Sequence, residues 1–441
     1  MTAETPAAAG LTHRRVLRIA VPVVVSNATV PILGAVDTGV VGQLGAASPI
    51  AAVGAGAIVL ASVYWIFGFL RMGTTGLAAQ ALGAGDRGEL VALLSRALLI
   101  AGVAGAALIA LQSALFAAAF RLAPVSSEVE ALARAYMSVR IWSAPAAIAI
   151  YGLTGWLIAQ ERTGAVLAVQ VAMNAANIAL DIWFVLGLGA GVVGVAWATF
   201  LAEWSGVALA LWFCRDAFAG TAWRDRSRVL DRVRLRRMAS VNGDIMARSV
   251  LLQAIFTSFL LTGGRFGDVT LAANQVLLQF LYITAYALDG FAFAVEALVG
   301  RFIGAGDRRA LRRAVVMCGS WGGGTVAVLA LAFVAGGGAL VDLMATAPTV
   351  RAAARDFLPW MVAAPLLGVA AWMLDGVFIG ATRTADMRNM MVLSFAAYVA
   401  AALALVPVFG NHGLWAALMV SFVARGITLG ARYPALERAA G

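Results

Sequence analysis

A short motif occurs twice in this chain at a fixed separation. The segment Gly-Ala-Gly-Asp-Arg at 83–87 recurs at 304–308, and Arg-Thr at 162–163 recurs at 383–384. Both recurrences are 221 residues apart (304 − 83 and 383 − 162). One constant offset at two separated places predicts two halves of equal length and plan. Both halves are dominated by apolar runs, which predicts two related helical bundles in a membrane, an arrangement typical of transporters.

The composition excludes a water-soluble globular protein. Of the 441 residues, 62% are hydrophobic and 12% are charged, whereas about 25% are charged in an average soluble domain. The net charge of +10 does not indicate a nucleic-acid-binding protein. The basic residues lie in short loops between apolar runs and form no continuous basic face.

The apolar runs predict an all-α polytopic membrane protein. A helix needs about 20 mostly apolar residues to cross the bilayer. Twelve segments meet this requirement: 15–42, 49–72, 90–120, 131–159, 163–186, 191–214, 239–262, 270–299, 310–343, 353–380, 388–408 and 413–432. Several exceed the minimum length, which predicts tilted or kinked spans or protruding ends.

The placement of arginine predicts the orientation. With twelve spans, both termini and five loops share one side, which carries 23 arginines against six on the other side. The positive-inside rule therefore predicts a protein of the inner (plasma) membrane with both termini in the cytoplasm. Six spans per half is an even number, so the halves should be related by a pseudo-two-fold axis along the membrane normal. The predicted parts are an N-lobe of residues 1–214, a cytoplasmic linker of 215–238 and a C-lobe of 239–441.

Ionisable residues inside the predicted spans are candidate functional positions, because each costs about 2.5–3.5 kcal/mol on insertion scales. Asp37 follows Pro31 in the first span. Proline removes a backbone hydrogen bond and favours a kink. A carboxylate beside such a kink is a candidate proton or sodium site.

The fifth span carries a polar stripe. Gln170, Asn174, Asn177 and Asp181 follow one another at steps of four, three and four, so they share one helix face. Such a stripe cannot face lipid and must face another helix or water. Helix packing would explain Gln170 and Asn174, whereas a carboxylate with an amide four residues earlier indicates a cation site.

The sixth span carries Thr199 and Glu203, again four residues apart. We expect these side chains to meet Asp181 in a cluster of carboxylate, amide and hydroxyl oxygens. Such a cluster suits groups that take up and release protons near neutral pH, and it equally suits Na⁺.

The second half also contains spans with polar and ionisable residues, but at different positions. The eighth span carries one polar face, made of Gln275, Gln279, Tyr282, Tyr286, Asp289 and Glu296. The tyrosines could stack on a flat organic cation or simply pack within the bundle. Asp375 lies in the tenth span, and Asp244 and Arg248, four residues apart in the seventh, are predicted to form an ion pair.

Motifs for other classes of protein are absent from the sequence. It contains no phosphate-binding loop, no Ser/His/Asp arrangement and no zinc-spaced cluster, so we expect neither an enzyme nor an ATPase. Cys214 and Cys318 are predicted to form no disulfide and no metal site, and His13 and His412 to have structural roles. The expected cofactors are none beyond a transported H⁺ or Na⁺.

Four stretches resemble the multidrug and toxic compound extrusion (MATE) family, in the branch of the DNA-damage-inducible protein F (DinF). They are Pro-Ile-Leu-Gly-Ala-Val-Asp-Thr at 31–38, Asn-Ile-Ala-Leu-Asp at 177–181, Ala-Tyr-Ala-Leu-Asp-Gly-Phe-Ala-Phe-Ala-Val-Glu-Ala at 285–297 and Met-Leu-Asp-Gly-Val-Phe-Ile-Gly-Ala-Thr-Arg at 373–383. The similarity covers essentially the whole chain. It implies two six-helix lobes around a central cleft, as in the wider MOP superfamily, and export of drugs or metabolites against an inward flow of protons or sodium.

The resemblance also implies roles for individual residues. Asp37 matches the first-span acid of the family, which is the coupling residue, and Asn177, Asp181 and Thr199 match the polar residues around a bound cation. Asp289, Glu296 and Asp375 match acids typical of this branch. Gln160 stands near a position where some relatives have asparagine, which leaves its membership of the cluster open.

Two functions follow as hypotheses. The first is a secondary antiporter, coupled to H⁺ rather than Na⁺, that exports organic cations as a monomer and binds no nucleic acid. In it, Asp37, Asn177, Asp181 and Thr199 couple the ion, while Glu203, Asp375 and the polar face of the eighth span contact substrate or a second ion. The alternative is a flippase for lipid or lipid-linked oligosaccharide. That function would need a basic cleft, and only Arg71, Arg248 and Arg425 lie inside spans.

Overall fold

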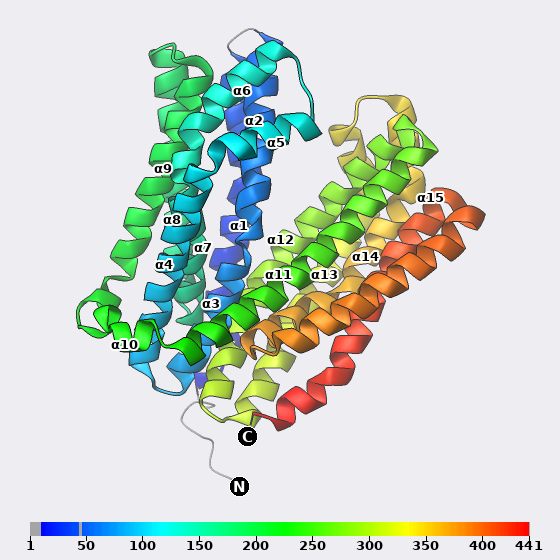
Figure 1. Cartoon of the computed structure of the whole chain (residues 1–441). Coiled ribbons are helices and arrows are strands. Elements are labelled where there is room, and N and C mark those ends of the chain that lie inside the picture. Colours follow the sequence, from blue (N-terminus) through cyan, green and yellow to red (C-terminus); the bar gives the residue numbers. More distant parts are fainter. Residues whose placement is uncertain (1–9, 44–45, 441) are drawn as a thin grey trace. The chain divides into compact units, whose positions relative to one another are not determined.

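The computed structural model describes residues 10–43 and 46–440, without the side chains of several residues between 30 and 38. The described chain is built from helices joined by short turns (Figure 1). The longer helices are α1 (His13–Gly42), α2 (Ala47–Ile66), α3 (Phe69–Gly83), α4 (Arg87–Ala110), α5 (Gln112–Leu122), α6 (Ser127–Arg140), α7 (Ala144–Ala159), α8 (Thr163–Asp181), α9 (Gly191–Phe213), α11 (Arg232–Gly263), α12 (Asp268–Gly304), α13 (Arg308–Met344), α14 (Pro348–Gly380) and α15 (Thr384–Arg438).

These helices confirm the predicted fold class. Among the described residues, ten helical stretches are long and apolar enough to cross a membrane. One of them, α15, contains the last two predicted spans and is bent at Gly410, whose φ of 56° and ψ of −130° are not helical. The helix α1 covers the first predicted span. The chain is an all-α polytopic membrane protein.

Several predicted spans are interrupted in the structure. The second is broken at Phe67 and Gly68 between α2 and α3, and the third at Leu111 between α4 and α5. The fourth passes through a 3₁₀ turn, Ile141–Ser143, just before Pro145, whose ring removes a backbone donor. In contrast, α11 begins at Arg232 instead of near 239, because Asp231 accepts a hydrogen bond from the backbone N–H of Arg234 (2.8 Å) and caps an arginine-rich extension.

The chain separates into two compact units. Unit 1 comprises residues 1–24, 79–85 and 238–441, and unit 2 comprises residues 25–78 and 86–237. In unit 2, α4 packs on α7, α8 on α9, and α2 on α6 (Figure 1). In unit 1, α14 packs against α12, α13 and α15. The cores are apolar, as shown by Phe259 and Trp415 in unit 1, whose rings meet edge to face with centroids 4.6 Å apart.

The repeated Gly-Ala-Gly-Asp-Arg motif is the same helix-to-helix turn in both places. Gly85 and Gly306 adopt φ values of 72° and 67°, which glycine tolerates without a Cβ clash. Asp86 and Asp307 then cap the next helices by accepting hydrogen bonds from the N–H three residues later, each at 2.9 Å. The motif is therefore a turn, as the sequence predicts, and not a phosphate-binding loop.

The second repeat, Arg-Thr, also has the same backbone in both halves. Glu161 and Thr382 precede it, and both adopt a positive φ (61° and 52°) although neither is glycine. The N–H of Arg162 bonds to the carbonyl of Leu157 (2.9 Å), and the N–H of Arg383 bonds to that of Phe378 (3.0 Å). Each pair of equivalent residues is 221 positions apart, so the internal repeat is structural as well as sequential.

Within unit 1, the glycines that begin the first motif bring two helix ends together. A Cβ on Gly83 would collide with the carbonyl of Arg301, and a Cβ on Gly304 would collide with that of Gln80. The end of α3 therefore crosses the end of α12 at backbone contact distance. The amide of Gln80 adds hydrogen bonds to the carbonyl of Gly380 (3.0 Å) and to the hydroxyl of Thr382 (3.1 Å).

The linker packs on unit 2 instead of extending into solvent. Arg96 in α4 is 1% exposed and donates to the carbonyls of Val229 (2.9 Å) and Arg228 (2.6 Å). The guanidinium of Arg228 in turn bonds to Asp86 (2.6 Å). Burial raises the pKa of the Asp86 carboxyl, but the N–H of Glu89 and the charge of Arg228 outweigh it and hold that pKa below its ordinary value.

The close crossing of α3 and α12 predicts that alanine is destabilising at a glycine in the crossing but not at a glycine outside it. Gly304→Ala places a methyl group against the backbone of Gln80 and should lower the stability of the protein by about 1–3 kcal/mol through overpacking. Gly324→Ala on α13 is the matched control, because nothing lies within 4 Å of its Cβ. Thermal unfolding in detergent measures both, and equal melting temperatures for the two variants would contradict the close crossing.

Candidate functional site

The polar stripe of α8 lies in unit 2, and its first half connects helices. Gln170 donates to the side-chain oxygen of Asn174 (2.9 Å), and Asn174 donates to the hydroxyl of Thr29 on α1 (2.9 Å). The prediction that Gln170 and Asn174 serve helix packing agrees with these contacts. They place α1 beside α8 at this level.

The second half of the stripe contains the most deeply buried carboxyl group among the described side chains of unit 2. Asn177 is 1% exposed and Asp181 is fully buried. The side-chain nitrogen of Asn177 donates to the hydroxyl of Thr199 on α9 (3.3 Å), and Thr199 donates to the carbonyl of Val195 (3.0 Å). The side-chain oxygen of Asn177 has no hydrogen-bond partner among the described residues. The structure thus brings Asn177 and Thr199 together one helical turn before Asp181.

Asp181 stands at a change of helix type. It is the last residue of α8, and the chain continues as a π-helical segment, Ile182–Gly187 (η3). A π turn is wider than an α turn and occurs mostly at functional sites. The backbone closes the segment with a bond from the N–H of Leu188 to the carbonyl of Trp183 (2.9 Å). Asp181 is therefore a buried carboxyl directly beside a widened turn.

The prediction for Asp37 concerns a side chain outside those that the structure describes. Its backbone lies in α1. One turn later, Val40 and Val41 are buried in a cluster with Val185 and Val195. This end of α1 therefore packs against η3 and α9.

Glu203 does not join this site as an unpaired acid. Its carboxylate forms a two-pronged ion pair with Arg140 of α6, at 2.7 and 3.1 Å. Arg140 also donates to the hydroxyls of Ser143 (2.6 Å) and Tyr136 (3.4 Å). We expected Glu203 to join Asp181 in a cluster of carboxylates, but Glu203 is paired with Arg140 instead. A guanidinium compensates the negative charge of Glu203, which a second acid would not do.

Gln160 also has a local partner. It is the C-terminal cap of α7, and its side-chain nitrogen donates to the carbonyl of Trp156 in its own helix (3.3 Å). The contact gives the carbonyl of Trp156, near the end of α7, a hydrogen-bond donor from the same helix, and it involves no residue of α8.

The polar face predicted for the eighth span is the least buried face of α12. Gln275 and Gln279 are exposed, and Tyr282 is 47% exposed. Tyr286 and Asp289 are half-buried, whereas Glu296, two turns further on, is 1% exposed. The opposite face carries Leu277, Phe280, Leu281 and other core residues of unit 1. The stripe therefore runs along one side of α12 and ends in a buried acid.

Asp375 lies in a buried cluster of unit 1 with two arginines. One of its oxygens pairs with Arg248 of α11 and lies 3.8 Å from the guanidinium of Arg425 of α15. The three residues are 5%, 8% and 3% exposed. Asp375 is thus already charge-compensated, and two of the three arginines predicted inside spans meet at it.

The predicted pair of Asp244 and Arg248 is wrong. Asp244 pairs with Arg388 and accepts a hydrogen bond from the hydroxyl of Thr384 (3.0 Å), while Arg248 pairs with Asp375. Spacing of four places two residues on one helix face, but both side chains point toward α14 and α15. Charges on these neighbouring helices offer each of them a buried partner.

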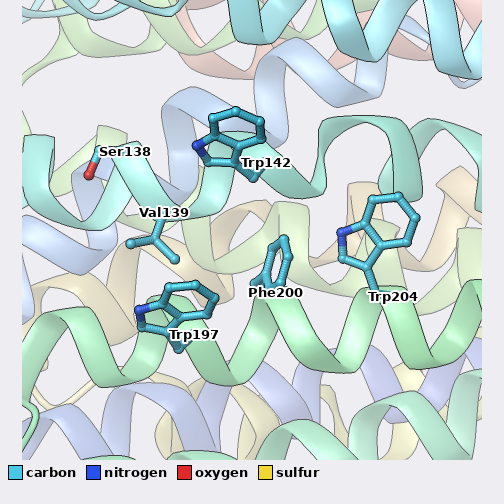
Figure 2. A pocket seen from close by; sticks show the side chains of 6 residues that line it. All are labelled: Ser138, Val139, Trp142, Trp197, Phe200 and Trp204. Carbon is cyan, nitrogen blue, oxygen red and sulfur yellow. The ribbon is translucent and has the colours of Figure 1, made fainter.

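A cavity of about 370 Å³ lies elsewhere in unit 2, between α6 and α9. Figure 2 shows the aromatic side chains that surround it, Trp142, Trp197, Phe200 and Trp204. Its lining is almost wholly apolar, and the three tryptophans are 40–55% exposed. None of the predicted site residues lines the cavity, so it is separate from the buried polar site.

The sequence analysis does not single out Arg140, although the residue falls inside the predicted segment 131–159. Its burial at 8% and its pairing with Glu203 place it within the helical bundle. An arginine inside an apolar segment, with an acid on another span to compensate it, was the available signal.

The fold and its two buried polar sites define a two-part helical membrane protein, and comparisons with known proteins give its family. The family model MatE matches residues 22–201 and 245–406. The DNA damage-inducible protein F of Escherichia coli is 38% identical over 423 residues, covering 94% of this chain and 90% of that protein. A probable multidrug resistance protein NorM of Bradyrhizobium diazoefficiens is 28% identical over 445 residues, covering 93% and 91%.

The fold of a solved transporter agrees with these matches. The bent form of the Vibrio cholerae MATE transporter VcmN superposes with a TM-score of 0.86 at 20% identity, covering 99% of both chains. The chain belongs to the MatE family. It is therefore a multi-pass membrane transporter and not an enzyme, and the resemblance found in its sequence is confirmed.

The cluster around Asp375 predicts a specific loss of stability. Asp375→Asn leaves Arg248 and Arg425 buried without a carboxylate, which should cost about 3–5 kcal/mol. Asp342→Asn is the matched control: its ion pair with Arg355 is partly exposed, and such surface pairs contribute about 0–1 kcal/mol. Thermal unfolding of both variants in detergent tests the difference. An Asp375→Asn protein as stable as the control would show that the arginines are compensated by other groups.

Proposed function

We propose that this transporter is a secondary antiporter, coupled to an inward flow of protons, that exports organic cations or toxic metabolites. The observation that carries the proposal is the fully buried carboxyl of Asp181, beside the Asn177–Thr199 pair at the start of a π turn. A buried acid in a membrane is costly. It is retained where binding and release of a cation is the task.

Two features support a place for Asp37 in the same site. The helix α1 contains the first predicted span and α8 lies in the fifth. Because successive spans alternate in direction, the first and the fifth run the same way through the membrane. They touch where Asn174 bonds to Thr29. Eight residues further along α1 is Asp37, and seven residues further along α8 is Asp181. At a rise of 1.5 Å per residue, both positions lie about 10–12 Å beyond the contact.

The internal repeat gives the second support. At the offset of 221, Asp37 corresponds to Ser258 and Asn177 corresponds to Tyr398. The hydroxyl of Ser258 donates to that of Tyr398 (3.3 Å). If the halves share their backbone, position 37 lies beside position 177. Asp37, Asn177, Asp181 and Thr199 then form one ion-coupling site in the N-lobe, which could hold a proton or, with the same oxygens, Na⁺.

The ion pairs of the other acids favour this assignment. Glu203 is compensated by Arg140, and Asp375 by Arg248. In each of these pairs the guanidinium compensates the charge of the carboxylate within the protein. Glu203 and Asp375, proposed from the sequence as substrate or second-ion contacts, are therefore better explained as structural partners.

The exposed face of α12 remains the proposed surface for substrate. Its glutamines, Gln275 and Gln279, offer hydrogen bonds, and Tyr282 and Tyr286 offer aromatic rings to a cation. Asp289 and Glu296 continue the same face, where they would contact substrate or a second ion. In this proposal a lobe of residues 1–214 and one of 239–441, joined by the linker 215–238, rock about a central cleft to alternate access.

The remaining features of the proposal come from the sequence. The excess of arginine on one side favours the inner (plasma) membrane, with both termini in the cytoplasm. We propose a functional monomer that needs no cofactor beyond the transported ion and binds no nucleic acid.

One observation favours a second function. Arg248 and Arg425 are buried together in unit 1 with only Asp375 between them, which leaves a net positive charge in that cluster. A basic interior suits an anionic substrate such as a lipid or a lipid-linked oligosaccharide, so a flippase is the alternative.

Asp181→Asn should reduce gradient-driven transport to background. The amide keeps the shape of the side chain but cannot bind and release a proton. The measurement is uptake of a fluorescent organic cation into inside-out proteoliposomes under a proton gradient or, separately, a sodium gradient. Asp268→Asn is the control, because Asp268 is an exposed acid at the start of α12. Asp37→Asn should match Asp181→Asn, whereas Glu296→Gln should have a milder effect.

Comparing the two gradients and the variants distinguishes proton-coupled export, export with a different coupling site, and the flippase. Uptake driven only by protons and lost in both N-lobe variants supports the proposal. Normal uptake by folded Asp181→Asn protein would refute the coupling site while leaving export in place. Absence of uptake by folded wild-type protein under either gradient would favour the flippase, to be tested next with lipid-linked substrates.

A further inference from the structure

A second cavity lies in unit 1, where the start of α1 meets α13. A cavity of about 580 Å³ opens there, within the size range of small-molecule sites. It is lined by His13 of α1 and by residues of α13 between 309 and 320. None of these residues takes part in the proposed ion or substrate sites.

The lining of this cavity changes character along one helix face. Arg309, Arg312 and Arg313 come first, followed by Val316, Met317 and Ser320. These positions are spaced 3, 1, 3, 1 and 3 residues apart, which places all six on one stripe of α13. The stripe is about 16 Å long, at a rise of 1.5 Å per residue. It begins with three guanidinium groups and continues through the apolar Val316 and Met317 to Ser320.

The basic end of the cavity is assembled from two helices. His13 is held by Trp321, whose indole N–H donates to Nδ1 of the imidazole (3.1 Å). Because Nδ1 accepts this bond, the neutral ring carries its proton on Nε2, which is available to donate to a ligand. The ring of Trp321 lies parallel to that of Phe291 of α12, with the ring centroids 6.4 Å apart. A neighbouring arginine, Arg308, is directed to Glu437 (3.2 Å) and does not line the cavity.

We propose that this cavity binds an anionic diacyl phospholipid. The phosphate of the headgroup would lie among the three arginines and His13, since guanidinium groups pair with phosphate oxygens through two parallel hydrogen bonds. The acyl chains would follow Val316 and Met317 into the membrane. Basic pockets between helices at a membrane surface are typical sites for anionic headgroups. The apolar half of the stripe favours a lipid over free phosphate, which would leave it uncovered.

Such a lipid would join two distant parts of the chain. The ligand would contact α1 through His13 and α13 through its arginines, 296 or more residues further along the sequence (309 − 13). It would therefore stabilise the packing of the start of α1 in unit 1, and the stability of the protein should depend on the lipid present.

The test uses the full-length protein in a neutral detergent. It is titrated with short-chain phosphatidylglycerol, with phosphatidylcholine of the same chain length, and with inorganic phosphate, and binding is followed by thermophoresis and by the shift in melting temperature. The triple variant Arg309→Gln/Arg312→Gln/Arg313→Gln removes the basic end of the cavity. The control, Arg232→Gln/Arg236→Gln/Arg237→Gln, removes three exposed arginines from the start of α11.

We expect phosphatidylglycerol to bind more tightly than phosphatidylcholine, and the triple variant of the cavity to weaken it by roughly a hundredfold. The control variant should bind as the wild type does. Met317→Trp, which fills the apolar end, should weaken the lipid and leave inorganic phosphate unaffected. If the triple variant does not fold, Arg312→Gln and Met317→Trp provide the same comparison.

Three results would overturn the proposal. Equal weakening by both triple variants would show attraction to diffuse surface charge. Equal affinity for the two lipids would show that the basic groups do not recognise the headgroup. Full competition by inorganic phosphate, with no effect of Met317→Trp, would show a phosphate site without a role for the acyl chains.

Discussion

The absence of water from the bilayer interior governs this structure. Backbone groups there must bond to one another, which leaves helices as the spanning elements, and polar side chains must find partners inside the protein. The buried polar residues accordingly form small connected sets: Asn174 with Thr29, Asn177 with Thr199, Glu203 with Arg140, and Asp375 with Arg248. Each set joins two different helices, which are consecutive for Asn177 and Thr199 and far apart in the sequence for the others. The pairs that satisfy polar groups thus also fix which helices are neighbours.

Features that depend on local sequence could be predicted. The apolar runs predicted the helices, and the repeated motifs predicted turns that recur at the same offset. The structure extends that repeat to positions where the residues differ, since Glu161 and Thr382 share a positive φ. The interruptions of the spans were less predictable. The break at Leu111 falls inside a predicted span, whereas the bend at Gly410 lies between the last two predicted spans, as expected.

The pairing of charges could not be read from spacing. Asp244 and Arg248 satisfy the rule for an ion pair on one helix, yet each is paired with a residue more than 120 positions away. A rule based on i and i+4 describes isolated helices, where no other partner exists. Inside a bundle, neighbouring helices offer buried partners, and the stronger interaction in a medium of low dielectric constant decides. The same reasoning explains why Glu203 is paired with Arg140.

The two units have kept the same turns but have acquired different chemistry. In unit 2, the side chains around the buried Asn177 and Asp181 include the neutral hydroxyl of Thr199. In unit 1, the position equivalent to Asn177 is Tyr398, which bonds to Ser258, and neither residue carries charge at neutral pH. One of the buried acids of that unit, Asp375, lies with two arginines. The repeated turns therefore preserve the backbone of both halves, while the buried polar side chains have diverged between them.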